Sequence, residues 1–221
     1  YLLTRPESCI RDYFITTSLT HDEATIRIRF AYNGDFAETK IKLQNENGKT
    51  VATGTVKAYE GSSTFTHQAI LSVKEPILWN PEKPYLYTLT LETPNEVITD
   101  RVGLRNIYIE NNKVYLNGHS IKFRGVNRHD SDPVTGPVIS VEHMKRDLKM
   151  IKEYNFNAIR TSHYPNDPRF MELCDRLGFY VCDENDIETH GMNPAGDWDE
   201  LTDNPAWTDA FVDRTARMYA R

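Results

Sequence analysis

The hydrophobic periodicity of the chain changes near residue 106, and this change constrains the possible folds more than any other feature of the sequence. Before it, short runs rich in β-branched and aromatic residues are separated by turn sequences such as Asn33-Gly34-Asp35. Within residues 25–30 apolar and polar side chains alternate, which is the period of a half-buried strand. After it, strand-like and helix-like periods alternate. The sequence therefore predicts a β domain over residues 1–105 and an α/β domain over residues 106–221.

The first domain is expected to contain about seven short strands, a number that is typical of an immunoglobulin-like β-sandwich. Turn sequences separate these strands along the chain. The expected strands cover residues 13–18, 24–32, 37–43, 50–56, 63–71, 85–91 and 97–102.

The second domain is expected to begin with a hairpin over residues 113–123, because Asn117-Gly118 is a typical two-residue turn. A first helix should follow the N-cap Ser140 and bury one face, made of Val141, Met144, Leu148 and Ile151. A second should follow Asp167-Pro168, end at Gly178 and bury a stripe of Met171, Cys174 and Leu177. A third should follow Asn204-Pro205 and carry Trp207, Phe211, Thr215 and Met218. Strands are expected before each helix, at residues 123–126, 157–162 and 179–182.

Successive strand–helix units predict parallel strands joined by right-handed crossovers. A closed (β/α)₈ TIM barrel takes about 250 residues, and residues 106–221 are too few for one. The second domain should therefore be a small open α/β domain or the first three βα units of an incomplete TIM barrel. The absence of a Met at position 1 suggests a piece of a longer protein.

Composition excludes several classes of function. The net charge is −6 and no basic stripe occurs, which argues against nucleic acid and anionic membranes as partners. No apolar run approaches the roughly 20 residues that cross a bilayer, and no signal-peptide pattern is present. The three cysteines lack CxxC spacing, which argues against a disulfide framework or a structural zinc site. A reducing cytoplasm is the expected compartment.

Polar side chains follow each strand of the expected parallel sheet. Because the carboxyl ends of parallel strands lie side by side, these residues should meet in one cleft. Arg160 lies in an apolar strand and should face a carboxylate there. Glu188 and His190 are two residues apart and could bind one divalent ion. The alternative for the acidic stretch 183–190 is a solvated loop with a chance histidine. The candidate cleft comprises Asn127, His129, Arg160, His163, Glu188 and His190.

Five stretches of the sequence closely resemble motifs of glycoside hydrolase family 2, and specifically of its β-galactosidases. The stretch 160–165 is shared with the family's β-glucuronidases, whereas 187–191 favours galactosidase. The resemblance covers nearly the whole chain and includes a sandwich motif. The motifs are Gly-Val-Asn-Arg-His at 125–129, Arg-Thr-Ser-His-Tyr-Pro-Asn at 160–166, Cys-Asp-Arg-Leu-Gly at 174–178, Asp-Glu-Asn-Asp-Ile-Glu-Thr-His-Gly at 183–191 and Leu-Trp-Asn-Pro-Glu-Lys-Pro-Tyr-Leu-Tyr at 78–87.

The resemblance implies retaining hydrolysis of terminal β-D-galactosides such as lactose. Two glutamates would act as nucleophile and acid/base, and both would lie beyond residue 221, so the isolated chain is expected to be inactive. Arg160 would contact the nucleophilic carboxylate, with Asn127 in support. His129 and His163 would contact the galactosyl group. Glu188 and His190 would bind Mg²⁺, with the acid/base as the third protein ligand, and the parent enzyme could also hold a monovalent cation.

The resemblance also bears on partners and leaves alternatives open. The expected partners are the β-galactoside and either the remainder of the parent enzyme or a complementary subunit, and the parent is expected to be oligomeric. One alternative is a fragment of a β-glucuronidase or β-mannosidase of the same family. Another is a non-catalytic module that binds a sugar or a partner protein.

Overall fold

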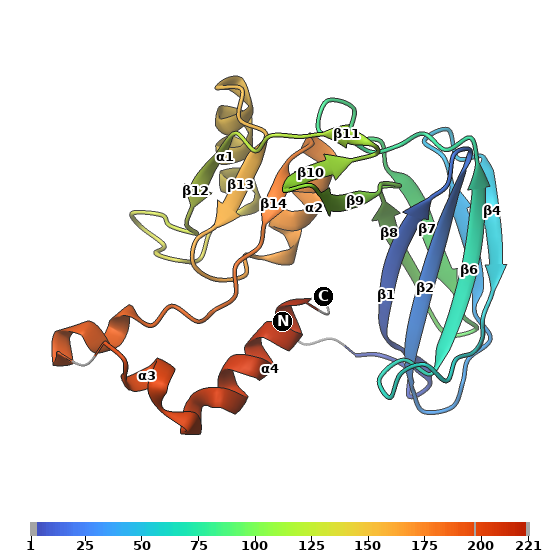
Figure 1. The fold of residues 1–221 in the computed structure, drawn as a ribbon. Helices are drawn as coiled ribbons and strands as arrows, with labels where there is room; N and C mark the ends of the chain where they lie inside the picture. Colours follow the sequence, from blue (N-terminus) through green and yellow to red (C-terminus); the bar gives the residue numbers. More distant parts are fainter. Residues whose placement is uncertain (1–3, 197, 220–221) are drawn as a thin grey trace. The chain divides into compact units, whose positions relative to one another are not determined.

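The structure is a computed structural model, and it describes residues 4–196 and 198–219. The chain forms two compact units, Tyr1–Lys122 and Phe123–Arg221 (Figure 1). Within the described residues, no helix is both long and apolar enough to cross a membrane.

The first unit contains two four-stranded antiparallel sheets that face each other across one core. Their strand order is that of the immunoglobulin fold, with β4 added beside β3, so the predicted sandwich is confirmed. The short strand β5 was not predicted, since two residues are too few to show a period. One sheet has the order β1 (Cys9–Leu19), β2 (Glu23–Asn33), β6 (His67–Lys74) and β5 (Lys57–Ala58), and the other has the order β4 (Thr50–Thr55), β3 (Lys40–Gln44), β7 (Tyr87–Glu92) and β8 (Val97–Val102).

Alternation along the strands explains the sandwich core. In β2 every second residue is buried, and Ile26, Ile28 and Phe30 are fully enclosed. Leu89 and Leu91 of β7 enter the same core from the opposite sheet. The polar residues between them face outward, as the two-residue period of a strand requires.

A small three-stranded sheet completes the first unit: β9 (Ile107–Glu110), β10 (Lys113–Leu116) and β11 (His119–Ser120). The predicted turn at Asn117-Gly118 is confirmed, since both residues have positive φ. The Asn117 side chain accepts a hydrogen bond from the Asn106 amide (2.9 Å) and donates one to the carbonyl of Trp79 (3.0 Å). These bonds join the small sheet to the sandwich, and the first compact unit therefore extends to Lys122.

Three parallel strands form the sheet of the second unit: β12 (Gly125–Arg128), β13 (Ala158–Thr161) and β14 (Tyr180–Cys182). Helix α1 (Val141–Glu153) connects β12 to β13, and α2 (Pro168–Leu177) connects β13 to β14. Figure 1 draws both helices behind the sheet. The predicted parallel βα units are therefore confirmed.

The ends of both helices follow from local chemistry. The Ser140 side chain accepts a hydrogen bond from the amide of His143, which caps α1. The Asp167 side chain accepts one from the amide of Arg169, and Pro168 occupies the first turn of α2. Gly178 ends α2 with φ of 76°. All three predicted boundaries are confirmed.

The core beneath the helices differs from the prediction on α2. Phe170 and Cys174 are buried, Met171 is half-buried, and Leu177 is 41% exposed. The predicted stripe was therefore wrong at Leu177. Either Phe170 or Met171 can share the face of Cys174 at a period of 3.6 residues, and the structure buries the larger side chain. Met144, Leu148 and Ile159 complete this core.

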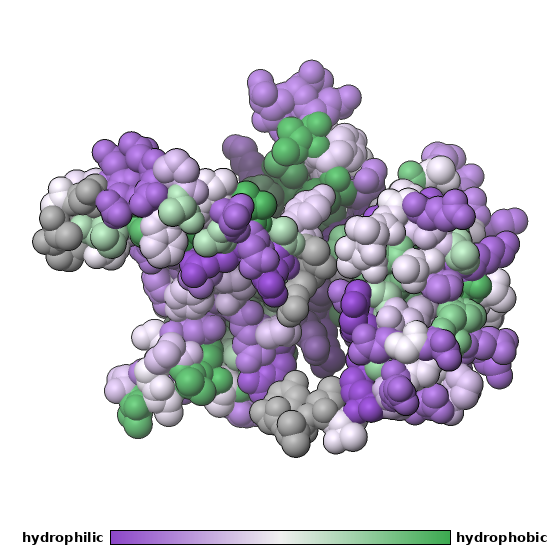
Figure 2. All heavy atoms as spheres, turned by 90° about the horizontal axis from the view of Figure 1, so that it is seen from below, coloured by the Kyte–Doolittle hydropathy of each residue, from purple (hydrophilic) through white to green (hydrophobic). Residues whose placement is uncertain are grey.

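The chain continues after β14 through η1 (His190–Ala195), α3 (Glu200–Asp203), η2 (Pro205–Trp207) and α4 (Thr208–Tyr219). The predicted third helix is confirmed as α4, although a separate 3₁₀ turn precedes it. No residue of α4 is buried among the described residues. On the face drawn in Figure 2, apolar residues form small separate patches within a hydrophilic surface.

Replacement of Gly178 by alanine is expected to destabilise the second unit by about 1–2 kcal/mol, because its φ of 76° brings a Cβ too close to the following carbonyl oxygen. Hydrogen exchange at the Ile159 amide in β13 measures the stability of this unit alone. Gly191→Ala is the matched control, because open space surrounds a Cβ at that position. Equal losses in the two variants would contradict the role of the left-handed conformation.

Candidate active site

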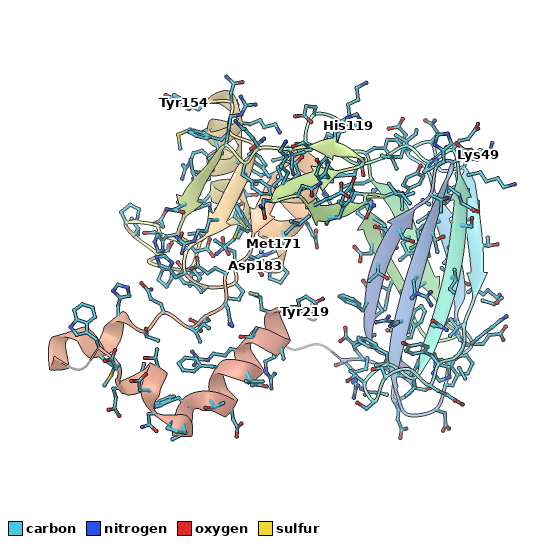
Figure 3. The ribbon with its side chains drawn as sticks, in the orientation of Figure 1. Lys49, His119, Tyr154, Met171, Asp183 and Tyr219 are labelled. Carbon is cyan, nitrogen blue, oxygen red and sulfur yellow. The ribbon has the colours of Figure 1, made fainter. Side chains whose placement is uncertain are left out.

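The carboxyl ends of the three parallel strands bring the predicted residues together. Asn127 of β12 is paired in register with Arg160 of β13, and Arg160 is paired with Cys182 of β14. Val126, Ile159 and Val181, each one residue away, pack against the helices. The side chains of Asn127, Arg160 and Cys182 therefore project from the opposite, helix-free face. Figure 3 labels Asp183, which follows β14 directly at this end of the sheet.

Arg160, His163 and Glu184 form the centre of the site. The Arg160 Nη2 lies 2.5 Å from the Glu184 Oε1, so the predicted carboxylate partner of Arg160 is confirmed. The His163 Nδ1 lies 3.1 Å from the same oxygen and 3.2 Å from Arg160 Nη2. Desolvation alone would raise the pKa of Glu184, but the hydrogen bonds and charges of His163 and Arg160 outweigh it and lower that pKa. The ionised form of Glu184 is therefore favoured.

Thr161 fixes the position of Glu184. Its hydroxyl is fully buried, donates to Asp183 Oδ1 (3.0 Å) and accepts from the Glu184 amide (2.9 Å). This pair of bonds ties the end of β13 to the chain that follows β14. The Glu184 side chain is thereby held against Arg160.

His129 meets His163 at the same strand ends. Their ring centroids are 5.5 Å apart at an angle of 77°. The hydroxyl of Tyr164 lies 3.5 Å from His129 Nδ1 and accepts a hydrogen bond from the Asp130 amide (3.1 Å). Two imidazoles and a phenol thus offer polar hydrogens and lone pairs beside the Arg160–Glu184 pair. We call Asn127, His129, Arg160, His163, Glu184 and Glu188 the strand-end cluster.

Asn127 lies beside the other cluster residues without bonding to them. Its side chain makes no hydrogen bond to any described residue. Residues 126–129 border a hollow of about 410 Å³ beside α1, whose wall includes Met150, Ile151 and Tyr154. The predicted supporting role of Asn127 stays a prediction.

The two predicted magnesium ligands are only partly assembled. Glu188 Oε1 lies 3.9 Å from His163 Nε2, and its side chain is 47% exposed. His190 begins η1, and its side chain has no hydrogen bond or ion pair with another described residue. Residues 4–196 and 198–219 contain no group of three His, Cys, Asp or Glu side chains placed to hold a metal ion. A carboxylate oxygen and an imidazole suit a divalent ion, so the donors present fit Mg²⁺ in kind but not in number.

Cys174 does not supply a nucleophile to this cluster. Cys9 and Cys174 are buried, and Cys182 is exposed. Burial raises the pKa of the Cys174 thiol to about 12, with the Asp175 charge acting in the same direction. Cys174 therefore stays protonated and serves the core beneath the helices.

Glu184 and Arg128 are important residues that the sequence reasoning missed. A signal for Glu184 exists: it lies two residues beyond Cys182, the register partner of Arg160, and therefore on the same side of an extended chain. Arg128 is 6% exposed and contacts four side chains. Its burial could not be predicted from the sequence, because Arg128 lies between the candidate site residues Asn127 and His129.

Family comparisons match both parts of the chain. Residues 8–105 match the family described as "Glycosyl hydrolases family 2", and residues 107–221 match "Glycosyl hydrolases family 2, TIM barrel domain". The chain is similar to a β-galactosidase of Staphylococcus xylosus, 40% identical over 97% of this chain and 21% of that protein. It is also similar to one of Pseudoalteromonas haloplanktis, 40% identical over 100% of this chain and 22% of that protein. The chain thus spans about a fifth of these relatives.

Solved structures show the same fold. A β-glucuronidase of Ruminococcus gnavus has a TM-score of 0.71 and 27% identity, with 81% of this chain and 29% of that chain covered. A β-D-glucuronidase of Dictyoglomus thermophilum has a TM-score of 0.71 and 24% identity, with 81% and 30% covered. The immunoglobulin-like sandwich, the three parallel βα strands and both family matches lead to one conclusion: the chain belongs to glycosyl hydrolases family 2, with its sandwich domain followed by the start of its TIM barrel.

Proposed function

We propose that this chain forms part of a retaining β-galactosidase and contributes sugar-binding residues to its active site. The substrates would be terminal β-D-galactosides such as lactose. The observation that carries the proposal is 40% identity to β-galactosidases over essentially the whole chain. The same chain brings Arg160, His163 and Glu184 together at the strand ends. Because the chain spans about a fifth of these relatives, the rest of the enzyme would supply the remaining groups.

The charges of the strand-end cluster fit a neutral sugar. Arg160 is the one arginine or lysine in that cluster, and it already pairs with Glu184. A uronate carboxylate bound there would find no unpaired arginine or lysine within the strand-end cluster itself. Juxtaposed like charges repel each other. Galactose brings hydroxyl groups instead, which His129 and His163 can bind.

The proposed mechanism is a double displacement. One glutamate attacks the anomeric carbon, and a second protonates the leaving glycosidic oxygen and then takes a proton from water. Both glutamates would come from parts of the protein outside this chain. The guanidinium of Arg160 would keep the attacking carboxylate ionised. His129 and His163 would bind the galactosyl group, and Asn127 would support the same cleft.

We further propose that Glu188 and His190 bind Mg²⁺ with one more ligand from outside the chain. The ion would supply a fixed positive charge beside the acid/base. Glu188→Gln is expected to weaken Mg²⁺ binding by at least about tenfold in the protein that carries this chain, because even outer-shell changes typically cost 10–100-fold. Calorimetric titration with MgCl₂ measures this. Glu172→Gln on α2 is the control, since that carboxylate is exposed, and unchanged affinity in Glu188→Gln would remove Glu188 from the ligand set.

The anomer that is released first tests the proposed reaction. The protein that carries this chain should hydrolyse an aryl β-galactoside and release the β-anomer first, which proton NMR detects before mutarotation. Release of the α-anomer first would contradict a retaining mechanism. This chain alone should give no turnover, and turnover that survives removal of host enzyme would contradict the assignment of both glutamates elsewhere.

A second candidate is a β-glucuronidase of the same family. The likeness in fold to two β-glucuronidases favours it, but the identity to them is lower than that to the β-galactosidases.

For partners, we propose the β-galactoside and the remainder of the enzyme, in an oligomer. The three unpaired cysteines support a reducing cytoplasm as the compartment.

A further inference from the structure

Arg128 is a charged residue almost wholly enclosed by the second unit. It is the last residue of β12, and its side chain is 6% exposed. A buried guanidinium is costly unless its donors are paired. Nη1 donates to Asp130 Oδ1 (2.7 Å) and to Asn166 Oδ1 (3.0 Å), and Nε donates to Asp147 Oδ2 (3.1 Å). Nη2 is buried and has no hydrogen-bond partner among the described residues. The guanidinium carbon lies 4.2 Å from the centre of the Phe170 ring.

These four partners come from four different segments. Asp130 lies in the loop after β12, and Asn166 lies in the loop after β13. Asp147 belongs to α1 and Phe170 to α2. One side chain therefore links both strand-end loops to the two helices that cover the sheet.

The same two loops carry His129 and His163. The Asp130 amide donates to the Tyr164 hydroxyl, which lies 3.5 Å from His129 Nδ1. Asn166 Nδ2 donates to the carbonyl of Tyr164 (3.4 Å). A shift of either loop would therefore change the 5.5 Å separation of the two imidazoles.

We propose that Arg128 is a positioning residue that sets the spacing of His129 and His163. The consequence for sugar binding rests on the proposed function, whereas the spacing itself does not. Stability alone does not explain this group, because well-packed apolar residues often replace buried ion pairs without loss. The planar guanidinium presents its donors in a fixed fork, which a lysine ammonium cannot reproduce. Arg128→Lys therefore keeps the charge and removes the geometry.

Proton NMR of the chain with ¹³C-labelled histidine rings tests the spacing. In the unmodified chain we expect a nuclear Overhauser effect between the rings of His129 and His163. Arg128→Lys should abolish it while the amide signals of Ile159 and Phe170 stay in place. Asn166→Ala is the second variant: it removes one acceptor and leaves both aspartates to balance the charge, so it should weaken the effect without unfolding the unit. Arg169→Gln is the control, because that arginine is exposed and pairs with Asp167.

A kinetic measurement distinguishes the spacing of the two imidazoles from their proposed role in sugar binding. In the protein that carries this chain, Arg128→Lys should lower kcat/KM for an aryl β-galactoside by about 100-fold, the typical effect of a misplacement of about 1 Å. An Overhauser effect that persists in both variants overturns the positioning role, whatever the kinetics. Loss of the effect with unchanged kcat/KM supports the positioning role and contradicts the proposed sugar contacts of His129 and His163.

Discussion

Truncation of Phe170 to alanine is expected to destabilise the second unit by about 3–5 kcal/mol, the usual cost of removing a buried phenylalanine ring. Phe170 is fully buried among Met144, Leu148 and Ile159. Its ring also supports the guanidinium of Arg128. The truncation therefore leaves a cavity under the sheet and removes a neighbour of a buried charge. Hydrogen exchange at the Ile159 amide reports the loss for this unit alone.

Leu177→Ala is the matched control for Phe170→Ala. Leu177 lies on the same helix and is 41% exposed. Its truncation should cost less than about 1.5 kcal/mol, because part of the side chain already meets water. Comparison of the two variants also tests the observed core against the sequence prediction, in which Leu177 is buried. A larger loss at Leu177 than at Phe170 would contradict the core described for α2.

Replacement of Arg160 by alanine is expected to lower kcat/KM for an aryl β-galactoside by about 10²–10³-fold, a typical effect of removing one preorganised electrostatic donor. The guanidinium pairs with Glu184 and lies 3.2 Å from His163. Its loss leaves the negative charge of Glu184 without its arginine partner. It also removes the positive charge that is proposed to keep the nucleophilic carboxylate ionised. The main effect should be a lower kcat, because the guanidinium is proposed to act on the nucleophilic carboxylate during the reaction. Steady-state kinetics of the protein that carries this chain measure it.

Arg176→Ala is the control for Arg160→Ala. Arg176 lies on α2, is 55% exposed and forms an exposed ion pair with Glu172. Such pairs contribute little, so its kinetics should stay within about twofold of the unmodified protein. Equal rates for Arg160→Ala and Arg176→Ala would exclude Arg160 from the catalytic machinery.

Local chemistry explains which parts of the fold were predictable. Ser140, Asp167-Pro168 and Gly178 mark helix ends through their own hydrogen bonds and dihedral angles, and all three boundaries are confirmed. Alternation in β2 likewise predicted a strand with one buried face. These features depend on a few neighbouring residues.

Features that depend on tertiary contacts were not predictable. The choice of Phe170 over Leu177 for the core depends on how α2 lies on the sheet. The burial of Arg128 depends on partners that are distant in sequence, such as Asn166 and Phe170. Glu184 was hidden within an acidic stretch whose Glu188 and His190 carried the family resemblance. The convergence of His129, Arg160 and His163 was predictable because parallel strands end side by side.

The ratio of two rates tests the central proposal most directly. The protein that carries this chain should be assayed with an aryl β-galactoside and the matching aryl β-glucuronide under identical conditions. We expect kcat/KM to favour the galactoside by at least about 100-fold, which corresponds to roughly 2.7 kcal/mol of discrimination at about 1.36 kcal/mol per factor of ten. Equal rates, or a preference for the glucuronide, would contradict the proposed β-galactosidase.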